Sequence, residues 1–116
     1  MKTFAEYAEK SASTTADFEH SEKPWYVALG LCGESGEVSD ALKKIFRKFG
    51  SFENAPAEKK THVLKELGDV LWYLNRMATV LGSSLEEVAK MNVEKLQKRK
   101  QAGTIIDSVK RDKADI

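Results

Sequence analysis

The sequence has little of what breaks helices or links chains covalently. Its 116 residues include two prolines and one cysteine, Cys32. A lone cysteine excludes an intramolecular disulfide and fits a reducing compartment, so the sequence predicts a cytoplasmic protein. No stretch approaches the roughly 18 apolar residues of a membrane-spanning helix, and the N-terminus lacks the apolar segment of a secretory signal. We therefore expect no membrane partner.

A charge excess of one sign is also absent. The net charge is +1, which gives no general attraction to duplex nucleic acid. With 41% hydrophobic and 32% charged residues, the composition is that of a globular, helix-rich chain and not a disordered one. The length suits one domain. We expect this domain to span residues 1–103, and residues 104–116, which show no clear period, to form a tail that is disordered or contacts a partner chain.

Helix-capping residues divide the chain into four helical segments. Thr3 with Glu6, and Ser84 with Glu87, have the spacing of a capping box. Gly50 and Gly82 suit the left-handed position that follows a helix. The predicted helices run from Thr3 to about Ser13, Pro24 to Phe49, Pro56 to Leu81, and Ser84 to about Lys100. Phe18, in the first connection, is expected to anchor that loop on the core. With no β-hairpin pattern, the fold class is predicted as all-α, a four-helix, bundle-like fold.

Two acidic pairs lie inside apolar stretches of the long helices. The pairs are Glu34 with Glu37 and Glu66 with Asp69, and a three-residue spacing puts both carboxylates of a pair on one side of a helix. Both pairs border the apolar stripe. Like charges about 5 Å apart repel by roughly 3 kcal/mol, so a cation is expected between them. Oxygen ligands favour Mg²⁺, Mn²⁺ or Ca²⁺. The pattern predicts a metal site with these four acids as ligands.

Simpler explanations of these residues also exist. The acids could be surface residues that pair with lysines one turn away, but such residues would lie opposite the apolar stripe. This explanation fits a single Glu better than it fits two spaced pairs that border the stripe. An oxygen-activating di-iron bundle is disfavoured because neither pair is a Glu-x-x-His motif. His62 lies one turn before Glu66 and could be a ligand, although a lone histidine beside a core is more often hydrogen-bonded.

The last predicted helix carries the opposite charge on one side. Asn92, Lys95 and Arg99 lie together beside apolar residues, and two cations with an amide could hold an oxyanion such as phosphate. The alternative is that these cations only complement the dipole of a helix C-terminus.

Glycines and surplus apolar residues in the two long helices indicate further packing. Gly30, Gly33 and Gly36 each cost a helix about 1 kcal/mol relative to Ala, so we expect a close approach on that face. They do not form a dinucleotide-binding fingerprint, because no strand precedes them. Apolar residues of the third predicted helix extend beyond one stripe, and they include Leu67, Leu71, Trp72 and Leu81. A helix apolar over so much of its circumference is buried on several sides, which predicts a homo-oligomer, a dimer or a tetramer.

Three segments together resemble a known family. They are GLCGESGEVSDALKK, KELGDVLWYLNRMA and NVEKLQKR, within residues 29–99. They are similar to the MazG-like members of the all-α nucleoside triphosphate pyrophosphohydrolase superfamily, whose pattern is Glu-x-x-Glu, a spacer and Glu-x-x-Asp. Here 28 residues separate the pairs. The resemblance implies Mg²⁺-dependent cleavage of a nucleoside triphosphate between the α- and β-phosphates, with Mn²⁺ as a possible substitute. Its expected role is the removal of unwanted nucleotides.

The resemblance also implies roles for particular residues. The metal ligands would be Glu34, Glu37, Glu66 and Asp69; the phosphate contacts would be Lys44, Asn92, Lys95 and Arg99; Tyr73 would lie against the sugar or base. Some family members carry an extra Glu directly before the first motif acid, where this chain has Gly33. The general base would then be a motif carboxylate such as Glu37, or water activated by the metal. A non-catalytic, metal-stabilised helical oligomer with a binding or regulatory role is the alternative.

Overall fold

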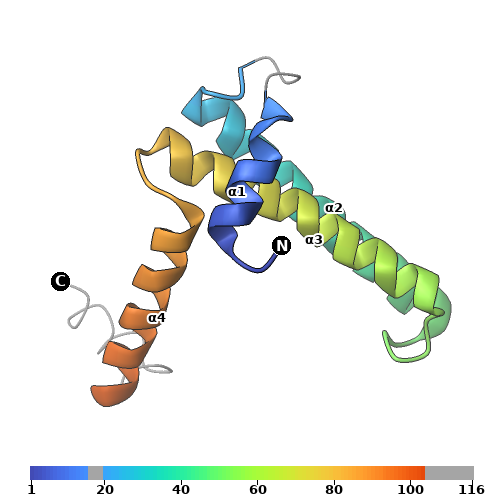
Figure 1. The fold of residues 1–116 in the computed structure, drawn as a ribbon. Helices are drawn as coiled ribbons and strands as arrows, with labels where there is room; N and C mark the ends of the chain where they lie inside the picture. Colours follow the sequence, from blue (N-terminus) through green and yellow to red (C-terminus); the bar gives the residue numbers. More distant parts are fainter. Residues whose placement is uncertain (16–19, 104–116) are drawn as a thin grey trace.

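The computed structural model describes residues 1–15 and 20–103, and these form an all-helical fold (Figure 1). Its helices are α1 (Phe4–Ala12), α2 (Pro24–Phe49), α3 (Ala57–Val80) and α4 (Leu85–Gln101). The prediction of four helices is confirmed, and within the described ranges no strand occurs. The predictions for Phe18 and for the tail at 104–116 lie outside the described residues.

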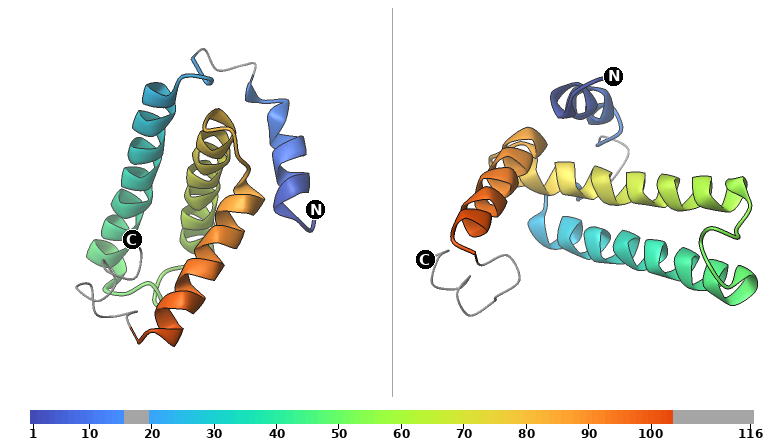
Figure 2. Two further views of the ribbon diagram at one scale, coloured as in Figure 1. Left: turned by 90° about the vertical axis from the view of Figure 1, so that its left-hand side faces the viewer. Right: turned by 90° about the horizontal axis from the view of Figure 1, so that it is seen from below.

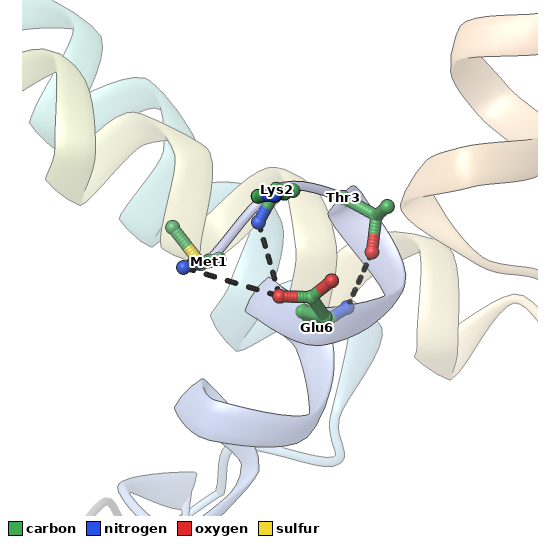
Figure 3. Close-up of polar contacts among 4 residues, drawn as sticks. All are labelled: Met1, Lys2, Thr3 and Glu6. Atoms are coloured by element: carbon green, nitrogen blue, oxygen red, sulfur yellow. Dashed lines mark hydrogen bonds and ion pairs between the residues drawn. The ribbon is translucent and has the colours of Figure 1, made fainter.

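The two predicted N-caps are present. Figure 3 shows the first, in which the Glu6 backbone N–H donates to Thr3 Oγ1 at 3.1 Å. The Glu6 carboxylate reaches one residue further back than a capping box requires, and accepts from the Lys2 backbone N–H at 3.0 Å. At α4 the Glu87 N–H donates to Ser84 Oγ at 3.1 Å. Each cap satisfies a donor that the first helical turn leaves without a partner.

The ends of the long helices follow their turn residues. Gly50 has φ 80° and its N–H donates to Phe46 O, which closes α2. Gly82 has φ 79°, and past it the Ser83 N–H donates to Ala78 O at 2.8 Å. Pro56 corrects the prediction, because it is the N-cap of α3 and not its first helical residue. Its extended ψ of 154° keeps it outside the helix, where its missing N–H costs nothing.

Helices α2 and α3 form an antiparallel hairpin in which they lie side by side along their length (Figure 2). A small core of Ile45, Ala55 and Val63 lies near the loop that joins them. Helix α1 crosses α3, and α4 contacts α3 and α1 but then diverges from the hairpin (Figure 1). The four helices of one chain therefore do not close into a bundle, and α2 and α3 provide the only long helix–helix contact among the described elements.

One chain leaves much apolar surface uncovered. Leu29 on α2, Leu81 after α3 and Met91 on α4 are 67%, 70% and 58% exposed. So many large exposed apolar side chains support the predicted homo-oligomer, which stays a prediction. None of the described helices is long and apolar enough to span a membrane.

Candidate metal centre

Three of the four predicted acids meet in the middle of the hairpin. Glu34 comes from α2, and Glu66 and Asp69 come from α3; one oxygen of each lies within 4.8 Å of the others. Oxygens on opposite sides of one ion, at bond lengths of 2.0–2.6 Å, are about 4–5 Å apart. The spacing of the three carboxylates is therefore compatible with a shared divalent cation such as Mg²⁺, and their all-oxygen chemistry suits that ion. We call these three residues the acidic cluster.

The negative charges of the acidic cluster repel one another. Burial raises the pKa of Glu34 above its ordinary value, and the negative charges of Asp69, Glu66 and Glu37 raise it further. Glu66 has 19% of its side chain exposed, and His62 Nε2 lies 3.4 Å from its Oε1. His62 therefore has a carboxylate partner, as expected of a lone histidine beside a core. A cation between the acids would offset the repulsion.

Glu37 lies outside the cluster. It is exposed, one turn further along α2, where it borders a cavity of about 220 Å³ together with Lys44 and His62. The Lys44 ammonium lies 2.8 Å from Asp40 Oδ2, and this bond raises the lysine pKa. The metal and base roles of Glu37 and the phosphate role of Lys44 stay predictions.

A second cavity opens on the other side of the cluster. Its volume is about 310 Å³, and its lining consists of Thr14, Glu34, Asp69, Trp72 and Tyr73. The predicted nucleoside contact, Tyr73, is therefore beside the metal ligands. Sequence reasoning missed Thr14, which lies in a polar stretch without any period. It placed Trp72 among five aromatic residues of the core or a subunit interface, one of which could also stack a base. We call this space the aromatic cavity.

Tyr73 is fixed in place by neighbours on α2. Its ring lies so close to Gly30 that any Cβ at that position would clash. Burial raises the pKa of the Tyr73 phenol, and Tyr26, which hydrogen-bonds to it, raises it further. The close approach predicted for the glycines is thus present at Gly30, whereas no atom lies near the Cβ position of Gly33 or Gly36.

The predicted phosphate contacts on α4 lie on a helix that diverges from the cluster within one chain. Asn92 and Lys95 are exposed on α4, which diverges from the hairpin, and Arg99 is partly buried near the end of that helix (Figure 1). Their phosphate contacts stay predictions.

Fold and site together define an all-α protein with a carboxylate centre suited to a divalent cation, and the comparisons with known proteins agree. The MazG nucleotide pyrophosphohydrolase domain matches residues 24–104. The Gene 37 protein of Mycobacterium phage L5 is 42% identical over 81 residues, which are 69% of this chain and 68% of that protein. The uncharacterized protein YvdC of Bacillus subtilis (strain 168) is 38% identical over 78 residues, 64% of this chain and 74% of that one. No solved structure matches significantly. The chain belongs to the MazG nucleotide pyrophosphohydrolase domain family.

Proposed function

We propose that the chain is a Mg²⁺-dependent nucleoside triphosphate pyrophosphohydrolase, with Mn²⁺ able to replace Mg²⁺. The water oxygen bonds to the α-phosphorus while the bond to the α,β-bridging oxygen breaks. The electron pair of the broken bond stays on the bridging oxygen, which leaves as part of pyrophosphate, and the water gives up a proton. The observation that carries the proposal is the convergence of Glu34, Glu66 and Asp69 beside a cavity with aromatic walls.

We assign separate roles to residues at different positions along the α2–α3 hairpin. Glu34, Glu66 and Asp69 would hold the ion, which when bound neutralises phosphoryl oxygens and makes water more acidic. Glu37, which lies outside the cluster, is the proposed acceptor of the water's proton. Lys44, which borders the same cavity as Glu37, is the proposed phosphate contact, and Tyr73, which lines the aromatic cavity, is the proposed contact with the sugar or base.

The working form is proposed to be a homo-oligomer that acts on intracellular nucleotide pools. Since α4 of one chain diverges from the acidic cluster, we propose that Asn92, Lys95 and Arg99 contact the substrate of a second copy. The exposed apolar residues of α4, among them Met91 and Leu96, support its burial against another chain.

A panel of ribo- and deoxyribonucleoside triphosphates tests the activity. With Mg²⁺ present we expect nucleoside monophosphate and pyrophosphate in equal amounts, and no product after chelation. Nucleoside diphosphate with inorganic phosphate as products would contradict the cleavage position. Mg²⁺ binding without turnover of any nucleotide would favour the non-catalytic alternative, to which Gly33, in place of an acid, gives some support.

A further inference from the structure

The N-terminal segment lies outside the residues that match the family, yet it contacts the aromatic cavity. Two side-chain hydrogen bonds join it to α3: Trp72 Nε1–H donates to Thr14 Oγ1 at 2.8 Å, and the Asn75 amide donates to Ser11 Oγ at 3.4 Å. One turn along, Arg76 Nε–H donates to Ser21 O at 2.6 Å. Asn75 is buried, and together these contacts join the segment to α3 beside the wall of the site.

Thr14 connects two parts of this wall. Its hydroxyl donates to Ser11 O at 2.6 Å, near the end of α1, and accepts the indole N–H of Trp72. The Trp72 ring meets the Tyr73 ring edge-on, with centroids 4.9 Å apart and planes at 76°. Tyr73 is itself held against Gly30. Each ring thus has a neighbour that favours one orientation, and both rings line the cavity together with Glu34 and Asp69.

We propose that Trp72 is the stacking surface for the nucleobase and that Thr14 is a positioning residue that holds its indole ring in place. This inference rests on the proposed function and deepens it. A nucleoside triphosphate needs a flat apolar surface within a sugar's length of the metal ligands, and the aromatic cavity provides both on its walls. Its volume of about 310 Å³ falls within the ordinary range for small-molecule sites.

The proposed occupant of the aromatic cavity is therefore the planar base of the nucleotide. Stacking on an aromatic side chain contributes about 1–3 kcal/mol for any base, which corresponds to roughly 5- to 150-fold in affinity. Inorganic triphosphate carries anionic phosphate groups and no base. Comparing the binding of a nucleotide with that of inorganic triphosphate therefore separates stacking on Trp72 from charge attraction at the acidic cluster.

The first experiment measures binding to the Mg²⁺-loaded protein by calorimetry. We expect Trp72→Leu to weaken the binding of a nucleoside monophosphate about tenfold or more and to leave inorganic triphosphate unchanged. Since the chain has two tryptophans, Trp25→Phe leaves Trp72 as the reporter, and the nucleotide should quench its fluorescence. Equal weakening of both ligands, or no weakening of either, would overturn the proposal.

The second experiment isolates Thr14. Thr14→Val keeps the side-chain volume but removes the hydroxyl, so we expect KM for the nucleotide to rise about threefold with kcat unchanged. Thr14→Ser should restore the parent value. In a Trp72→Phe background, which lacks the indole N–H, Thr14→Val should have no further effect on monophosphate affinity. A threefold loss that persists in that background would show that Thr14 acts by another route. This cycle remains decisive if Trp72→Leu fails to fold.

The outcomes separate this inference from the proposed function. If no nucleotide is hydrolysed but monophosphate affinity depends on Trp72, stacking stands and the activity fails. If nucleotides are hydrolysed while Trp72→Leu changes neither KM nor monophosphate affinity, the activity stands and stacking fails.

Discussion

The middle of the α2–α3 hairpin and helix α4 carry the same kind of sequence pattern and have different structural outcomes. Each places charged residues beside an apolar stripe at helical spacing. In the hairpin two helices pack along their length, so acids from both meet within 4.8 Å. On α4, Lys95 and the apolar residues Val88, Met91 and Leu96 are exposed, and only Arg99 of the predicted cations is partly buried. Periodicity identifies the face of a helix, and only a packed neighbour decides what that face meets.

The largest effect should come from the hairpin. Glu66→Gln removes one negative charge from the acidic cluster, so we expect turnover to fall at least about 100-fold while the protein remains helical by circular dichroism. Glu37→Gln tests the proposed base in the same assay. Glu94→Gln, which makes the same change on the exposed face of α4, should leave turnover near the parent value. Full Mg²⁺-dependent activity in both Glu66→Gln and Glu37→Gln would contradict the site.

A smaller loss is expected on α4. Lys95→Ala should lower kcat or raise KM about tenfold through a lost charge-assisted contact, with Mg²⁺ affinity unchanged. Loss of Mg²⁺ affinity in this variant would place Lys95 at the metal and not at the phosphates.

Mixing variants then tests whether α4 acts on a second copy. If Lys95 of one chain serves the acids of another, a re-equilibrated one-to-one mixture of Glu66→Gln and Lys95→Ala dimers regains about a quarter of the parent activity, because half the dimers are mixed and each holds one intact site. If α4 acts on its own chain, mixing restores nothing.

The apolar side of α4 gives a further test of whether this helix, unlike the hairpin, needs another copy of the chain as its packing partner. Met91 is 58% exposed in one chain, so Met91→Glu should cost little in the monomer but prevent burial of α4 against another copy. Light scattering should show the parent as a multiple of 13.0 kDa and the variant with a smaller mass. A parent protein that is already a 13.0 kDa monomer at micromolar concentration would refute the oligomer.

The sequence predicted those features that depend on residues near one another in the chain. Thr3, Ser84, Gly50 and Gly82 determined the helix ends because each acts on its own backbone. The acidic cluster was also predictable, since two helices of this length joined by a short loop must lie antiparallel.

Tertiary partners were not predictable. Nothing in the polar stretch around Thr14 indicates that its hydroxyl accepts a bond from Trp72, 58 residues away. Gly30 was one of three similar glycines, and only the fold shows that Tyr73 packs on it and not on Gly33 or Gly36. The separation of Glu37 from the other acids likewise depends on how α2 and α3 face each other, which the spacing of one helix does not determine.

The smallest expected effect concerns stability, and it distinguishes the charged hairpin from α4 without any substrate. The pKa of Glu34 is raised in the folded protein, first by burial and then by neighbouring acids. A raised pKa means that the folded state holds this proton more tightly. The stabilising contribution is therefore complete below the ordinary value of 4.5 and is lost as the pH rises through the raised value.

Without a metal the negative charges of the cluster repel one another, and Mg²⁺ should raise Tm by a few degrees, at about 5 °C for each 1 kcal/mol of binding to the folded state. The increase should shrink as the pH falls toward the raised pKa of Glu34, since protons compete for the same oxygens. Differential scanning fluorimetry at several pH values measures this directly. Glu34→Gln should reduce the Mg²⁺ effect at every pH, whereas Glu94→Gln should not. A Tm that millimolar Mg²⁺ leaves unchanged at neutral pH would mean that the three carboxylates do not hold the ion until substrate joins them.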